Sequence, residues 1–308
     1  MKHKTVLLEE AIDALNLKKD GIYIDATFGR GGHSKLLLQR LGEKGSLLVM
    51  DKDPQAIKSA EELCSADSRC VCHYGSYVDM QEVVIQKGWQ NKVDGILLDL
   101  GVSSPQLDEA QRGFSFMSNG PLDMRMNTGA GETAAEWLDG ADQNEIADVL
   151  WKYGEERFSR RIAAAIVERR QEERIETTAD LASIISGAMP RKDKHKHPAT
   201  RSFQAIRIFI NRELEELSAV LEQITQVLKP GGRAAIISFH SLEDRLVKRF
   251  FKKLSGVAGD LPPGIPYVSE QHKARIKLIG KAIKPGKKEI ETNVRARSAV
   301  MRVVELLA

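Results

Sequence analysis

The feature that most constrains the fold of this chain is an alternation of short apolar runs with longer helical patterns. Four apolar runs lie near the start, and three of them end in an aspartate: Gly21–Asp25, Ser46–Asp51, Arg69–His73 and Val93–Asp99. Helical patterns at 34–41 and 54–64 separate the first three runs. Strands that alternate with helices at this spacing form right-handed βαβ units, so the sequence predicts a parallel sheet covered by helices.

The alternation stops after Gly101 and resumes near residue 202. The intervening segment has loops rich in Gly, Ser and Pro and no convincing strand, and its helical patterns lie at 134–138, 143–151, 156–170 and 178–189. The sheet pattern then returns with a long helix, a strand, a helix and a closing strand, at 203–228, 233–239, 242–254 and 297–307. We therefore predict an α/β domain made of residues 1–105 and 202–308, with an inserted helical domain at 106–201 that recognises the substrate.

Composition and cysteine content indicate where such a protein works. Of the 308 residues, 42% are hydrophobic and 29% charged, and no run approaches the roughly 20 apolar residues that span a bilayer. Glu9 and Glu10 interrupt the N-terminus before a signal-peptide core can form. We therefore expect a cytoplasmic protein with no membrane partner. The odd, clustered set Cys64, Cys70 and Cys72 predicts reduced thiols, and its spacing offers no metal site.

Positive charge is concentrated in two segments although the net charge is only +3. From Arg245 to Arg297 there are 14 Lys and Arg residues against 4 Asp and Glu residues. A second basic run covers 191–197 and is followed by Arg201. Clustered positive charge is typical of proteins that bind polyphosphates, although a solvated surface has the same pattern.

A glycine-rich loop follows the first predicted strand, from Asp25 to Ser34, and its glycines let the backbone approach a ligand. Asp51 ends the second strand 22 positions after Gly29, where a carboxylate can accept both hydroxyls of an adenosine ribose. NAD and S-adenosylmethionine share this requirement. The loop lacks the third glycine of the dinucleotide pattern, and the fourth strand ends in a polar turn at 99–105. Both observations favour S-adenosylmethionine.

Longer motifs then resemble one family. They are Asp-Ala-Thr-Phe-Gly-Arg-Gly-Gly-His, Leu-Asp-Leu-Gly-Val-Ser-Ser-Pro-Gln, Arg-Gly-Phe-Ser-Phe, Gly-Pro-Leu-Asp-Met-Arg-Met, Tyr-Gly-Glu-Glu-Arg-Phe and Ser-Phe-His-Ser-Leu-Glu-Asp-Arg, which begin at residues 25, 98, 112, 120, 153 and 238. They are similar to the motifs of the bacterial family that methylates the exocyclic N4 of a cytidine in small-subunit (16S) ribosomal RNA. The likeness runs from the segment at 3–7 to that at 293–298.

The resemblance implies a class I, Rossmann-like methyltransferase sheet with an inserted helical domain. It implies S-adenosylmethionine as the cofactor and small-subunit ribosomal RNA, in an assembled or partly assembled subunit, as the partner. It assigns the cofactor pocket to Gly31, Gly32, His33, Asp51, Tyr77, Asp99 and Gln106, with Tyr77 where the family often has Phe. The sulfonium methyl is already activated, so the enzyme needs neither a metal nor a covalent intermediate.

Candidate catalytic groups lie at the ends of the fourth and fifth predicted strands: Asp99, Ser103, Ser104 and His240. We expect them to hold the amine in line with the methyl group and to accept its hydrogen bonds. In the predicted insertion, Phe114, Phe116 and Met117 have two interpretations, since they can stack on a base or seal the insertion onto the sheet.

Three other functions stay open at this point. They are a non-catalytic ribosome-assembly factor, an NAD-dependent oxidoreductase and a DNA cytosine-N4 methyltransferase. The cofactor residues disfavour the first, because binding RNA alone requires no such pocket. The sequence leaves open which cytidine is modified, which group acts as a base, the stage of assembly and the oligomeric state, a homodimer included.

Overall fold

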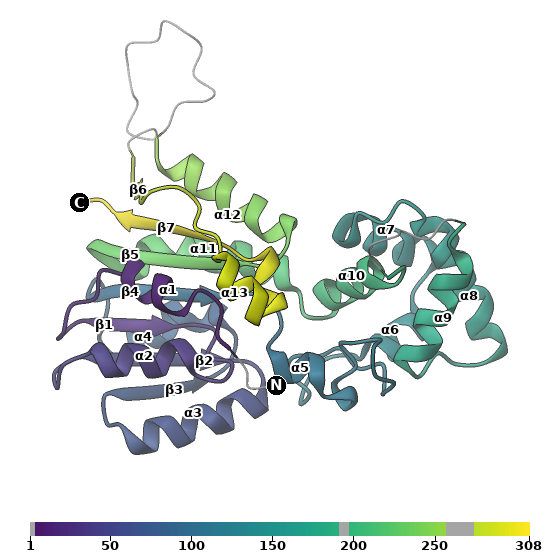
Figure 1. Ribbon diagram of the computed structural model, residues 1–308, viewed down its shortest axis with the longest axis horizontal. Coiled ribbons are helices and arrows are strands. Elements are labelled where there is room, and N and C mark those ends of the chain that lie inside the picture. The colour runs from purple at the N-terminus through teal and green to yellow at the C-terminus, as the bar shows by residue number, and fades with distance from the viewer. Residues whose placement is uncertain (1–3, 191–196, 257–273) are drawn as a thin grey trace, which may run out of the picture. The chain divides into compact units, whose positions relative to one another are not determined.

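A computed structural model describes residues 4–190, 197–256 and 274–308 of the chain (Figure 1). The chain divides into two compact units. The first unit comprises Met1–Gly101 and Leu214–Ala308, and the second comprises Val102–Glu213. The chain therefore passes between the units at 101/102 and at 213/214, whereas the sequence patterns put these junctions at 105/106 and 201/202. Within the described ranges, no helix combines the length and the apolar character needed to cross a membrane.

The first unit is built on a seven-stranded sheet with the order β3-β2-β1-β4-β5-β7-β6 (Figure 1). Its strands are β1 (Ile22–Asp25), β2 (Ser46–Asp51), β3 (Cys70–Tyr74), β4 (Val93–Asp99), β5 (Leu228–Ser238), β6 (Ile276–Leu278) and β7 (Val300–Leu306). Neighbours among β1–β5 pair in parallel, and β7 runs antiparallel to both β5 and β6. This arrangement confirms the predicted class I, Rossmann-like α/β sheet. The strand order reverses between β1 and β4, where open α/β sheets bind their ligands.

Helices cover both faces of this sheet. One hydrophobic cluster packs α4 (Met80–Gln86), α11 (Glu213–Val227) and α12 (Ser241–Leu254) against the sheet, and the other packs α1 (Leu8–Ala14), α2 (Gly32–Arg40) and α3 (Pro54–Ala66). Successive side chains of β4 alternate between them, because strand side chains point to opposite faces. Ile96 and Leu98 join the first cluster and Leu97 the second. A strand buried on both faces explains the unbroken apolar run Ile96–Leu98 in β4.

The second unit is helical. It contains α5 (Ser104–Asp108), α6 (Ala134–Gly140), α7 (Gln143–Gly154), α8 (Ser159–Glu172), α9 (Thr178–Ala188) and α10 (Thr200–Ile210). Capping boxes begin three of them: Ser103 and Gln106 bond each other's backbone at α5, as do Thr133 and Glu136 at α6 and Thr177 and Asp180 at α9. The described part of this unit has one isolated bridge, Pro121 with Thr177, and no named strand.

The predicted long helix over 203–228 is wrong, because the segment forms two helices. α10 ends at Ile210 and α11 begins at Glu213. Arg212 between them has a positive φ of 51°, which no α-helix contains. Asn211 is buried and bonds the 124–126 loop: its Oδ1 accepts from Met126 N–H at 2.7 Å, and its Nδ2 donates to the Met124 carbonyl at 2.7 Å. These distant partners fix the break.

The expectation of three reduced thiols is also wrong. Cys64 near the end of α3 forms a disulfide with Cys70 at the start of β3, and the two Cα atoms are 4.7 Å apart. The chain turns back over the five residues between them, which brings the two Sγ atoms together. Among the residues that the structure describes, Cys72 is the free thiol.

Replacing Asn211 with alanine should destabilise the second unit. The variant loses the two bonds to the 124–126 loop and a third to the Arg207 carbonyl, at 2.9 Å. Because buried backbone groups are then left unpaired, we expect the free energy of unfolding to fall by about 2 to 4 kcal/mol. Urea denaturation measures this change. The exposed Asn144→Ala variant on α7 is the control, with a change within about 0.5 kcal/mol; equal stability of both variants would refute the role of Asn211.

Candidate functional site

The glycine loop between β1 and α2 has a backbone that side chains would obstruct. Gly29 and Gly31 have positive φ angles of 57° and 72°, and Gly31 is the N-cap of α2. A Cβ on Gly31 would lie 2.6 Å from the Phe28 ring, and one on Gly32 would overlap the Thr5 side chain. Glycine is therefore required at both positions by the packing of Phe28 and Thr5, whereas the space beside Gly29 is open at the switch point of the sheet.

Asp51, at the carboxyl end of β2, holds this loop. Its Oδ2 accepts the Gly29 N–H at 2.8 Å, and its Oδ1 accepts the Asp53 N–H at 2.9 Å. Burial raises the pKa of Asp51 to about 6, against the lowering effect of these two bonds and of Lys52. Each carboxylate oxygen has a further lone pair with which it can accept a hydroxyl.

Asp25, at the end of β1, caps the turn that follows it. Its Oδ2 accepts from Ser34 Oγ at 2.5 Å, and its Oδ1 accepts the Thr27 N–H at 3.3 Å. Burial raises the pKa of Asp25 to about 6, although the bond from Ser34 lowers it.

Asp99 ends β4 beside this loop. Its N–H donates to Thr27 Oγ1 at 2.6 Å, and its Oδ2 lies 3.7 Å from Nδ1 of the buried His33. Its Oδ1 is buried and has no hydrogen-bond partner among the described residues. Desolvation, followed by the charges of Asp25 and Glu243, raises the pKa of Asp99 well above its usual value. The structure thus brings a basic carboxylate with an unused acceptor oxygen to the end of β4.

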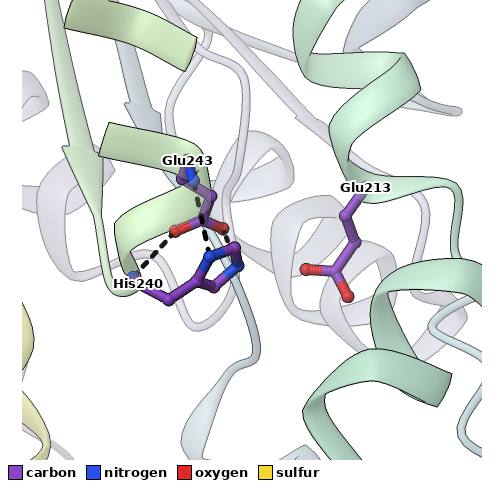
Figure 2. A group of neighbouring side chains, drawn as sticks. All are labelled: Glu213, His240 and Glu243. Carbon is purple, nitrogen blue, oxygen red and sulfur yellow. Dashed lines mark hydrogen bonds and ion pairs between the residues drawn. The ribbon is translucent and has the colours of Figure 1, made fainter. Parts of the chain in front are cut away.

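His240 is the N-cap of α12 and pairs with Glu243, a residue that the sequence analysis missed (Figure 2). His240 Nδ1 accepts the Glu243 N–H at 3.4 Å, while Nε2 lies 3.2 Å from Glu243 Oε1. Glu243 Oε2 in turn accepts the N–H groups of Phe239, at 2.8 Å, and His240, at 3.3 Å. The three-residue spacing of a capping box was the signal available in the sequence. Glu213, also drawn in Figure 2, pairs with Arg207 of α10 through two bonds of 2.8 Å.

The other predicted cofactor and catalytic residues lie on short helices. Tyr77 begins the 3-10 helix Tyr77–Asp79 after β3 and packs, half-buried, against the hydrophobic cluster that contains α4. Ser103 is the N-cap of α5, and its N–H donates to Oε1 of the buried Gln106 at 2.8 Å. Ser104 is the first residue of the same helix. These three α5 residues belong to the second unit, and the glycine loop, Asp51, Tyr77, Asp99 and His240 belong to the first.

The aromatic segment at 114–117 contributes mainly to packing within the second unit. Phe114 is buried, and Phe116 stacks on His197 with ring centroids 4.4 Å apart and meets the edge of Phe203 at 5.1 Å. Met117 differs, because 81% of it is exposed. The basic run predicted at 191–197 lies, apart from His197, outside the described residues.

The first unit has the donor and acceptor groups that an adenosyl cofactor requires. A carboxylate with spare lone pairs ends β2, and the loop that follows β1 has open space beside Gly29. The acceptor oxygen of Asp99 ends the next strand, β4. A ribose diol suits the first group and an uncharged backbone contact suits the second.

Comparison with known proteins decides the family. The model of the MraW methylase family matches residues 1–307. The chain belongs to this family. It is the family of 16S ribosomal RNA cytosine-N4 methyltransferases that the motifs resemble, so this MraW-family methylase uses S-adenosylmethionine and methylates ribosomal RNA.

The solved structures to which the chain is similar include other methyltransferases. An rRNA methylase from Streptococcus thermophilus has 10% identity and a TM-score of 0.44, and the match covers 100% of both chains. A SAM-dependent O-methyltransferase from Thermotoga maritima has 12% identity and a TM-score of 0.42, with 100% of this chain and 69% of that chain covered. NSun6 from Pyrococcus horikoshii has 13% identity and a TM-score of 0.44, with 99% and 53% covered.

Replacing Asp51 with alanine should weaken the binding of S-adenosylmethionine at least tenfold, or about 1.4 kcal/mol. The variant removes the acceptor for the ribose hydroxyls and the partner of the Gly29 N–H. Isothermal titration calorimetry measures the dissociation constant. The matched control is Asp20→Ala, which should bind as the wild type does. Asp20 is exposed and lies just before β1 begins, at the end of that strand away from the glycine loop. Unchanged affinity in a folded Asp51→Ala variant would remove Asp51 from the site.

Cofactor affinity should also depend on pH. Ribose hydroxyls donate to the ionised form of Asp51, whose pKa in the free protein is about 6, so protonation competes with binding. We expect a constant affinity above about pH 7 and a loss that approaches tenfold per pH unit below pH 6. Titrations between pH 5 and pH 8 test this, with Asp51→Asn expected to bind more weakly at pH 7.5 and to lose most of the slope. A wild-type affinity that rises on acidification would contradict the assignment.

Proposed function

We propose that this methylase transfers the methyl group to the exocyclic N4 amine of a cytidine in small-subunit ribosomal RNA. The substrate is an assembled or partly assembled subunit, and the enzyme accordingly acts in the cytoplasm. The observation that carries the proposal is the buried, unpartnered Oδ1 of Asp99 at the end of β4, beside the glycine loop. An exocyclic amine has two N–H groups to donate, and this oxygen is an acceptor.

The chemistry that this site must supply is modest. When bound, S-adenosylmethionine supplies a methyl group that is already activated. The amine is a poor nucleophile because its lone pair is conjugated with the ring, so the protein must orient it and accept its proton. Asp99 is the proposed acceptor, since a raised pKa makes its carboxylate a stronger base. His33, whose Nδ1 lies 3.7 Å from that carboxylate, orients it.

Three catalytic candidates remain besides Asp99. Ser103 and Ser104 follow it by four and five residues in the chain, and we assign their hydroxyls to the amine. His240 is held by Glu243, and in the proposal it orients the base. The cofactor residues are Gly31, Gly32, His33, Asp51, Tyr77, Asp99 and Gln106, and the helical unit recognises the RNA.

The cysteines support nitrogen rather than carbon as the target. Methylation at C5 of a pyrimidine requires a nucleophile that adds to the ring, and a cysteine thiolate is the usual group. The chain has three cysteines. Cys64 and Cys70 are bonded to each other, and Cys72 lies within β3, at the edge of the sheet, where the two strands β2 and β1 separate it from β4. An amine target needs no such nucleophile.

Incubation with methyl-labelled S-adenosylmethionine and small subunits that lack the modification should yield N4-methylcytidine in the ribosomal RNA. Nuclease digestion and mass spectrometry against N4- and C5-methylcytidine standards identify the product. Asp99→Asn should lower kcat at least about a hundredfold, because it removes the proton acceptor. Label in C5-methylcytidine or in another nucleoside would refute the N4 assignment. Methylation by Asp99→Asn at the wild-type rate would refute the role of Asp99.

A further inference from the structure

Helix α12 carries a row of five cations on one face. They are spaced three, one, three and one residues apart, which puts them on one side of an α-helix: Arg245, Lys248, Arg249, Lys252 and Lys253. All five side chains are exposed. The row extends over about 12 Å, since each helical residue adds about 1.5 Å. We call these five residues the α12 cationic face.

The opposite side of α12 is fixed in the core of the first unit. Val247 and Phe251 are buried there, and Leu246, Phe250 and Leu254 pack half-buried against the same cluster. The helix therefore has one possible outward face. A basic amphipathic helix can also bind a membrane, but only by inserting its apolar side. In α12 that side is already packed against the sheet, so a lipid surface is a poor partner.

The carboxylates of α12 are turned away from the cationic face and engaged elsewhere. Asp244 accepts two hydrogen bonds from Arg302 of β7, at 2.7 and 3.0 Å. Glu243 is buried and accepts the N–H groups of Phe239 and His240. The exposed side of the helix thus presents positive charge without interspersed acids. Such a surface attracts a polyanion and contacts phosphates without reading base sequence.

The helix also begins at the candidate active site. His240 caps it, and Glu243 in its first turn holds that histidine. Arg245 follows Glu243 by two residues, and the other four cations continue toward Leu254 at the end of the helix. A strand whose target base lies at the His240 turn can therefore continue along the helix with its phosphates against the cations.

We propose that the α12 cationic face binds the phosphate backbone of the ribosomal RNA strand next to the nucleotide that is methylated. The identity of the partner as ribosomal RNA rests on the proposed function, and the surface itself rests on the geometry of α12. The face supplies affinity and register, and it takes no part in the chemical step. Its loss therefore acts on substrate binding and leaves turnover intact.

The test is the charge-neutralising double variant Lys248→Gln/Lys252→Gln. Its matched control is Lys44→Gln/Lys58→Gln, which removes two exposed lysines from other elements of the same unit. Binding to a small-subunit rRNA transcript is measured between 50 and 200 mM potassium chloride. Two lost phosphate contacts should reduce the slope of log affinity against log salt by about 1.4 to 1.8, and the control should keep the wild-type slope. Equal slopes for both variants would overturn the proposal.

Steady-state methylation of small subunits gives an independent readout. We expect the α12 variant to raise KM for the subunit at least about tenfold, with kcat unchanged. Its affinity for S-adenosylmethionine should equal that of the wild type, which also verifies that it is folded. A raised KM without a change of slope on the transcript would mean that an acidic protein is the partner, and would overturn the RNA assignment. If the slope changes but the product is not N4-methylcytidine, the proposed function fails and the binding surface stands.

Discussion

The hydrogen bond from the Gly29 backbone to Asp51 fixes the part of the sheet on which the candidate site depends. It ties the loop after β1 to the end of β2 at 2.8 Å, next to a second bond from Phe28 N–H to the Met50 carbonyl at 2.9 Å. On the other side, Ala26 N–H donates to the Leu97 carbonyl of β4 at 2.9 Å. Hydrogen bonds therefore connect the loop to β2 and to β4, in addition to β1, which it follows in the chain. Its left-handed glycines can hold their conformation because these bonds determine it.

The same arrangement brings carboxylates close together in a poorly solvated region. Burial raises the pKa of Asp25 and of Asp51 to about 6, and the charge of Asp51 adds to the effect on Asp25. A carboxyl whose pKa is raised on folding disfavours the folded state once it ionises, so this cost grows from about pH 4 and is complete above pH 6. The hydrogen bonds from Ser34, Thr27, Gly29 and Asp53 offset part of it. A cluster of this kind is typical of functional sites, because packing alone would favour neutral side chains.

Much of the sheet could be predicted from the sequence because its signals are local. The apolar runs that end in Asp25, Asp51 and Asp99 became β1, β2 and β4, and the helical pattern at 54–64 became α3. The break at 211–212 could not be predicted, because both flanking segments share helical spacing and the partners of Asn211 are some 85 residues away in the chain. The three-residue strand β6 is too short for a periodic pattern. Within the site, Glu243 escaped notice because its carboxylate serves a histidine cap, a less common capping residue than Ser, Thr, Asp or Asn.

The central claim is that the loop and Asp51 form a site for S-adenosylmethionine rather than for a dinucleotide. The most direct measurement is a calorimetric titration of the full chain with S-adenosylmethionine and, separately, with NADH. The account predicts saturable binding of S-adenosylmethionine with a stoichiometry of one per chain and no heat from NADH beyond dilution. Binding of NADH alone would contradict it, because the site would then require a pyrophosphate in addition to an adenosine group.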